Sequence, residues 1–206
     1  MAVLGHVDSG KTSILDKIRG TGVQGREAGG ITQHIGASFL PDETIKKICG
    51  SLYDKLGKEE TKIPGLLVID TPGHEVFTNL RARGGSAADI AILVVDINRG
   101  FQPQTNESLK ILESRKVPFV VALNKVDMIS GWQKSDIPYI SEAVKNQASY
   151  VQTTIDEQIY NVVGALSILG YQSEAFYRVQ DFKKEISIVP VSARSGVGIP
   201  ELLAVL

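Results

Sequence analysis

The sequence is poor in cysteine and has no excess of charge of either sign. Cys49 is its single cysteine, so no disulfide can form within the chain, and we expect an intracellular setting in which Cys49 packs as a small apolar residue. Lys and Arg number 22 against 23 Asp and Glu, a net charge of −1. This balance argues against a domain that binds nucleic acid through its overall charge, although a local basic face is still possible.

Long hydrophobic runs are also lacking, so the sequence predicts no membrane-spanning helix and no membrane partner. Residues 1–4 are a short strand rather than a signal peptide, and we expect a cytoplasmic protein. The length suits one α/β domain. The first strand is short and the last helix ends at Leu206 while still apolar, so we expect residues 1–206 to be one domain excised from a longer protein.

Apolar runs alternate with helical patterns, which is typical of a mostly parallel sheet with helices on both faces. The expected strands are Met1–Gly5, Ala37–Leu40, Leu66–Asp70, Ile90–Asp96, Phe119–Asn124 and Ile186–Val191. The expected helices are Lys11–Arg19, Glu75–Arg83, Thr105–Arg115 and Pro200–Leu206. The fold class predicted is therefore α/β with six strands, mostly parallel because continuous Val, Ile and Leu runs suit strands buried on both faces.

Two segments exceed this minimal plan. Residues 41–63 have apolar positions at helical spacing, and Gly57 would close that helix. Residues 132–184 form a longer helical insertion within the domain. Its apolar residues keep a helical period, and Gly170 suits a C-cap. They are Ile140, Val144, Ala148, Val151, Ile155, Ile159, Val162 and Leu166.

The segment Gly5–Thr12 fits the phosphate-binding pattern G-x-x-x-x-G-K-[ST] between a strand and a helix. Glycines allow successive N–H groups to face one point, and the helix adds its positive N-terminal end. Lys11 can neutralise the β- and γ-phosphates, and the Thr12 hydroxyl can ligate Mg²⁺. The residues expected to bind nucleotide here are Asp8, Ser9, Gly10, Lys11, Thr12 and Ser13.

A second string, Asp70-Thr71-Pro72-Gly73-His74, ends the next apolar strand. A carboxylate at Asp70 can hold Mg²⁺ directly or through water, and Gly73 allows its N–H to approach a γ-phosphate. The glycine-rich loop Gly29-Gly30-Ile31-Thr32, before the second expected strand, can also move. Thr32 would ligate Mg²⁺ only when a γ-phosphate holds that loop shut.

Two further strings can recognise a guanine base. The Asp127 carboxylate offers two acceptors that match guanine N1–H and N2–H₂, and it would repel adenine. The stem of Lys125 can lie along the base, and Asn124 can tie the loops together. Backbone N–H groups of Ser192 and Ala193, after the last strand, can meet guanine O6.

All four strings follow strands, so they should converge on one crevice at the carboxyl ends of the sheet. Together they predict a P-loop GTPase fold that binds GTP or GDP with Mg²⁺ and hydrolyses GTP as a switch.

These strings resemble the translational GTPases. Residues 26–37, Arg-Glu-Ala-Gly-Gly-Ile-Thr-Gln-His-Ile-Gly-Ala, are similar to the switch region of the translation initiation factor 2/5B family. The helical segment before Leu66 and the insertion after Trp132 resemble its archaeal and eukaryotic branch. One departure is Ser9, where many members of the family carry His.

The resemblance implies roles for individual residues. His74 would orient the attacking water, and Val7 with Ile31 would form an apolar gate that keeps His74 back until the ribosome engages. Asp8, helped by backbone carbonyls around Gly30, would bind Na⁺ or K⁺ near the β- and γ-phosphates. Asp8 as a hydrogen-bond acceptor that braces the loop remains an alternative. His6 and His34 are interpreted as structural rather than catalytic.

The resemblance also implies partners. The GTPase would be stimulated at the large-subunit GTPase centre of the ribosome and would promote ribosomal subunit joining. Contacts with initiator tRNA and other initiation factors would be made by domains absent from this chain. Two alternatives stay open: an elongation-type factor, and a scaffold that binds GTP without hydrolysing it. His74 and the Gly29-Gly30 pair weigh against the scaffold, and residues 30–37 with the insertion weigh against the elongation factor.

Overall fold

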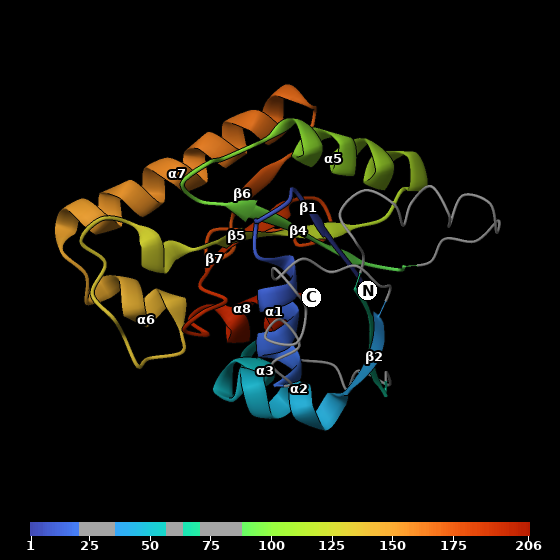
Figure 1. Cartoon of the computed structure of the whole chain (residues 1–206), viewed down its shortest axis with the longest axis horizontal. Helices are drawn as coiled ribbons and strands as arrows, with labels where there is room; N and C mark the ends of the chain where they lie inside the picture. Colours follow the sequence, from blue (N-terminus) through green and yellow to red (C-terminus); the bar gives the residue numbers. More distant parts are fainter. Residues whose placement is uncertain (21–35, 57–63, 71–87) are drawn as a thin grey trace.

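The computed structural model describes residues 1–20, 36–56, 64–70 and 88–206. Over these residues the chain forms a seven-stranded sheet in the order β2-β3-β1-β4-β5-β7-β6, with helices on both faces (Figure 1). The edge strand β2 (Gly36–Pro41) runs antiparallel to β3. The other strands are parallel: β3 (Gly65–Asp70), β1 (Ala2–Gly5), β4 (Ala91–Asp96), β5 (Phe119–Asn124), β7 (Ile186–Val191) and β6 (Ser173–Ala175).

The predicted α/β class is confirmed, but the strand count of six is wrong. The additional strand, β6, lies inside the 132–184 insertion and pairs with β7 at the edge of the sheet. Its three residues, Ser-Glu-Ala, contain no apolar run, so only the pairing with β7 makes them a strand.

The central strands are buried on both faces, which is why their sequences are continuous apolar runs. Along β4, Leu93 and Val95 enter one core and Ile92 and Val94 enter the other. The first core packs beneath α5 (Pro103–Arg115) and α7 (Ser149–Ile168), which lie above the sheet in Figure 1. The second packs against the helices below it: α1 (Lys11–Arg19), α2 (Asp42–Cys49) and α8 (Ile199–Val205).

Cys49 is a free cysteine in this second core and is fully buried. Burial raises the pKa of its thiol to about 11. The thiol therefore stays protonated at neutral pH, and the expectation of an apolar packing role is confirmed.

The helix expected over residues 41–63 is two helices. It breaks at Gly50, which has a φ of 54°, between α2 and α3 (Ser51–Leu56). A residue with this positive φ cannot continue an α-helix, and glycine accepts it without a steric cost from a side chain. The proposed closure at Gly57 lies outside the described residues.

The helical period of the insertion is also divided, into α6 (Ile140–Lys145) and α7. Gln147 lies at the break, and its side-chain amide is buried. Its Oε1 accepts the N–H of Gln133 at 2.7 Å, and its Nε2 donates to Gln133 O at 3.0 Å. Gly170 caps α7 as predicted. Its φ is 85°, its N–H donates to Ser167 O, and the next N–H donates to Leu166 O, the pattern of a Schellman motif.

The other helices begin and end within two residues of their expected bounds, except Glu75–Arg83, which lies outside the described residues. Helix α5 starts at Pro103 because Gln102 and Thr105 form a capping box before it. Within the described part of the chain, no helix has the length and apolar character needed to cross a membrane.

Candidate functional site

Four loops meet at one edge of the sheet because β1, β4, β5 and β7 are parallel and in register there. Gly5 is paired with Val94, Asp96 with Asn124, and Asn124 with Val191. The segments after β1, β5 and β7, which carry three of the four sequence motifs, therefore lie at the same edge. The motif that begins at Asp70 lies outside the described residues beyond Asp70 itself.

The loop between β1 and α1 curves around the ammonium of Lys11. That ammonium donates to the carbonyls of Gly5 at 3.1 Å and His6 at 2.8 Å. Gly10 is the N-cap of α1 with a φ of 94°, and a Cβ there would clash with the side chain of Asn124. No acidic residue lies in the first turn of α1. The positive helix end and the Lys11 ammonium therefore face the same concave loop, which fits a phosphate group.

Asn124 joins three of the loops, as expected. Its side-chain Nδ2 donates to Ser9 O at 2.8 Å, and its Oδ1 accepts the N–H of Ala193 at 3.0 Å. Asn124 itself ends β5 and is buried. Because both amide atoms are bonded in a dry site, Asn124 fixes the phosphate loop against the loop after β7.

A cavity of about 650 Å³ lies beside Asn124, which contributes to its lining. It brings together residues from the first, third and fourth sequence motifs, with the end of α1 as a further wall. Its lining includes Gly10, Ser13, Lys125, Asp127 and Ala193. Asp127 lies in the short 3-10 helix Val126–Met128 that follows Lys125. The cavity is large enough for a base and ribose, and it adjoins the phosphate loop at Gly10.

The backbone N–H groups of Ser192 and Ala193, after β7, have hydrogen-bond partners within the chain. The N–H of Ala193 is bonded to Asn124, and the N–H of Ser192 donates to Val197 O at 2.8 Å. Both N–H groups that we expected to meet guanine O6 are therefore hydrogen-bonded within the chain in this structure, and their contact with guanine stays a prediction. The reason is that buried Asn124 and the turn after β7 each need a donor, and these two N–H groups are the donors they use.

Asp96 is a residue of this edge that the motif analysis missed. It ends β4, and its buried carboxylate lies 2.8 Å from Lys125 Nζ. Burial alone would raise the pKa of Asp96, but hydrogen bonds from Lys125 and from the N–H of Asn98 outweigh it and lower that pKa. An acidic residue that closes an otherwise apolar run is the sequence signal that could have identified it.

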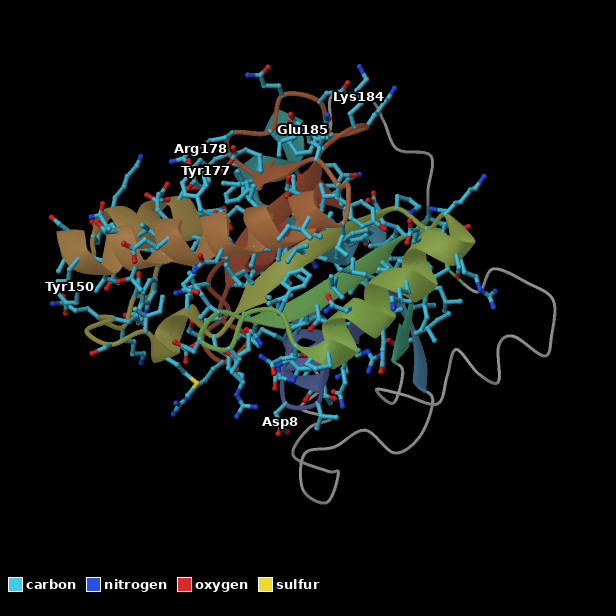
Figure 2. All side chains as sticks on the ribbon, turned by 90° about the horizontal axis from the view of Figure 1, so that it is seen from above. Asp8, Tyr150, Tyr177, Arg178, Lys184 and Glu185 are labelled. Atoms are coloured by element: carbon cyan, nitrogen blue, oxygen red, sulfur yellow. The ribbon has the colours of Figure 1, made fainter. Side chains whose placement is uncertain are left out.

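Three other residues of the phosphate loop have distinct surroundings. Val7 is 39% exposed, and its N–H donates to Oε1 of Gln104 at 3.0 Å. Asp8 has a φ of 63° and projects from the body of the molecule (Figure 2). Ser9 is fully buried and packs beside Gly5. The sequence had placed Ser9 among the nucleotide-binding residues, and in the structure its hydroxyl does not line the cavity.

His6 is buried next to this loop, and burial is the main cause that lowers its pKa. Its imidazole is therefore neutral at neutral pH, which agrees with a structural interpretation. The expectations for Gly30, Ile31, Thr32, Gly73 and His74 fall outside the described residues. Asp70 is described only as the last residue of β3, beside β1.

Comparison with known proteins connects this geometry to a family. The model of the elongation factor Tu GTP binding domain matches residues 1–206. The chain belongs to this family of GTP-binding domains. Its members are translational GTPases, so the cavity beside the phosphate loop is the candidate GTP site of such a domain.

Translation initiation factors are among the similar proteins within the family. The chain is 55% identical to a probable translation initiation factor IF-2 of Thermococcus onnurineus and 57% identical to one of Methanopyrus kandleri. Both matches cover the whole chain and 34% of the relative. A crystal structure of GDP-bound aIF5B from Aeropyrum pernix superposes with a TM-score of 0.86 at 54% identity, covering 99% of this chain and 34% of that one. The chain thus spans about a third of the length of these relatives.

Proposed function

We propose that this translational GTPase domain binds GTP and GDP with Mg²⁺ and hydrolyses GTP as the switch of a translation initiation factor. The observation that carries the proposal is the single cavity shared by the phosphate loop, Lys125 and Asp127. The name of the similar Aeropyrum pernix protein, a GDP-bound aIF5B, supports it. The domain would act in the cytoplasm, where ribosomes are found.

The residues present fit a guanine nucleotide. The concave loop offers Lys11 and the positive end of α1 to the phosphates, and a Cβ at Gly10 would clash with the Asn124 amide that holds this loop against the loop after β7. Asp127 lines the adjoining cavity, where its two oxygens would accept from guanine N1–H and N2–H₂. Ala193 closes the cavity as an apolar wall.

The Mg²⁺ ion would neutralise charge that develops on the phosphates. Its protein ligands would be Thr12 and Asp70, with Thr32 added when a γ-phosphate holds the switch closed. Thr12 is in the first turn of α1 and Asp70 ends the strand beside β1, so both belong to the same edge of the sheet. Gly73 would donate its N–H to the γ-phosphate.

His74 would orient the attacking water, with Val7 and Ile31 holding it back until the ribosome engages. The exposure of the Val7 side chain on the phosphate loop supports this proposal, because an apolar gate must be open to solvent. The same proposal makes hydrolysis slow in the isolated domain, because positioning of the water supplies most of the rate.

Asp8 would hold Na⁺ or K⁺ beside the β- and γ-phosphates, with carbonyls near Gly30. Its carboxylate has no hydrogen bond or ion pair within the described part of the chain, and its left-handed backbone turns it outward (Figure 2). Replacing Na⁺ and K⁺ by a bulky organic cation should slow GTP hydrolysis without changing GDP affinity. Unchanged hydrolysis would leave Asp8 as a brace for the loop.

Partners follow from the initiation factors that the chain resembles. Stimulation would come from the large-subunit GTPase centre of the ribosome, and the switch would promote subunit joining. Initiator tRNA and other initiation factors would be contacted by segments that this chain does not contain.

Single-turnover GTP hydrolysis, measured with and without archaeal ribosomes, tests the proposal. We expect slow hydrolysis alone and strong stimulation by 70S ribosomes. Tight GTP binding with no hydrolysis in either case would indicate a GTP-binding scaffold. An elongation-type factor would instead carry aminoacyl-tRNA, which a binding assay on the longer protein distinguishes.

A further inference from the structure

Asp96 is the buried acid of the site edge that the four sequence motifs leave unexplained. Its side chain is 4% exposed, and both oxygens are engaged. Oδ2 accepts from Lys125 Nζ at 2.8 Å, and Oδ1 accepts from the N–H of Asn98 at 2.9 Å. Arg99 Nε lies 4.0 Å from Oδ2. A carboxylate held this firmly at the end of a strand has a fixed position relative to the cavity.

Lys125 connects Asp96 to the cavity. Its side chain contributes to the cavity lining, whereas Asp96 does not. The Lys125 backbone is left-handed, with a φ of 72°, and its ammonium is bonded to Asp96. The flexible stem is therefore fixed at both ends, by its backbone and by its ammonium, and little rotamer freedom remains to be lost when a flat base lies on it.

Two further acids line the same cavity as Lys125. Asp127 follows Lys125 by two residues, and Asp16 of α1 lines the same cavity. An ammonium that turned to Asp127 would occupy acceptor lone pairs that guanine N1–H and N2–H₂ require. It would also neutralise the charge that makes those two hydrogen bonds strong.

We propose that Asp96 is a positioning residue that determines base specificity. It holds the Lys125 stem as a platform for the guanine ring and keeps the Lys125 ammonium away from Asp127. This inference rests on the proposed function, because it assigns a further residue to the same nucleotide site.

The change Asp96→Asn tests it, since the amide keeps the shape and can still accept the Asn98 N–H. Three probes are compared by competition against fluorescent GDP: GDP, inosine diphosphate, which lacks the 2-amino group, and inorganic triphosphate, which lacks a base. We expect GDP affinity to fall about tenfold and inosine diphosphate affinity to fall less. Triphosphate affinity should stay unchanged, because the phosphate loop is intact.

Asp42→Asn is the matched control. It breaks an ion pair of the same length, 2.8 Å from Lys46, on α2 and away from the cavity. All three affinities should be unchanged in that variant. Lys125→Met keeps an apolar stem without the ammonium, and in this background Asp96→Asn should cause little further loss of GDP affinity. The double variant also removes both charges together, so it guards against unfolding from one uncompensated buried charge.

The possible results distinguish a failure of this inference from a failure of the proposed function. Equal losses for all three probes, with a lower unfolding temperature, would give Asp96 a purely structural role and overturn the inference. Unchanged GDP affinity, or unchanged preference for GDP over inosine diphosphate, would overturn it as well while leaving the proposed function intact. A wild-type domain that binds no guanine nucleotide would overturn the proposed function and this inference with it.

Discussion

At the scale of single residues, we expect Asp127 to determine the base specificity of the site. It lines the cavity, and a carboxylate is the side chain that accepts from guanine at two positions. Asp127→Asn exchanges an acceptor for a donor, so guanine loses its match while xanthine, with an acceptor at C2, gains one. An unmatched buried polar group costs roughly 1–3 kcal/mol. We expect GTP affinity to fall by at least about tenfold and xanthosine triphosphate affinity to rise.

A nucleotide competition assay measures both affinities. Asp136→Asn, an exposed position of the loop before α6, serves as the control and should leave both unchanged. An unaltered preference for GTP over xanthosine triphosphate in Asp127→Asn would remove Asp127 from the base site.

At the scale of elements, the junction between α8 and α6 contains a buried carboxylate. Glu201 of α8 is 2% exposed, and it accepts backbone N–H groups of Ile140 and Ser141 at the start of α6. Among the residues that the structure describes, its Oε2 finds no hydrogen-bond partner. Burial raises the pKa of Glu201 to about 7, and the backbone hydrogen bonds only partly offset this. The insertion is thus joined to α8 by a carboxyl group that titrates near neutrality.

This predicts a pH-dependent stability. The folded pKa of Glu201 lies above its ordinary value of 4.5, so the stabilising neutral form is fully present below about pH 4.5 and is lost as the pH rises through 7. The loss is of the order of 3 kcal/mol. Glu201→Gln should remove this slope, making the variant the more stable protein at pH 8 and similar to wild type at pH 5. Urea unfolding at both pH values measures it.

Glu157→Gln on the exposed face of α7 is the matched control and should leave the slope in place. Equal slopes in wild type and Glu201→Gln would show that the carboxyl group of Glu201 is not the group that titrates at this junction.

At the scale of the whole molecule, binding and chemistry should be separable. The phosphate loop, Lys125 and Asp127 border one cavity at the sheet edge, and hydrogen bonds of Asn124 connect the phosphate loop to the loop after β7. His74 lies on a different segment of the chain. On our proposal, His74→Ala removes the group that orients the attacking water and leaves the residues around this cavity unchanged. We expect GTP affinity close to wild type and ribosome-stimulated turnover below about a tenth of it.

Equilibrium GTP binding and single-turnover hydrolysis with ribosomes provide the two measurements. His34→Ala is the control, since that histidine is interpreted as structural, and it should retain most of the turnover. A His74→Ala variant that keeps more than a tenth of wild-type turnover would return His74 to a structural role.

The amino-acid sequence by itself determined the fold class, the family and the order of the loops around the crevice. It could do so because buried parallel strands need continuous apolar runs, and because phosphate binding and base recognition need particular residues directly after those strands. The cap at Gly170 was also predictable, because the left-handed conformation at the end of a helix favours glycine.

Only the tertiary structure decided which donors and acceptors are already used. The N–H of Ala193 is bonded to Asn124, and Lys125 is bonded to Asp96, residues that are 69 and 29 positions away in the chain. The strand β6 and the break at Gln147 have the same origin, since one needs β7 beside it and the other needs Gln133. Periodicity and motifs report local preferences, whereas hydrogen-bond partners of buried polar groups are fixed by which distant segments the fold brings together.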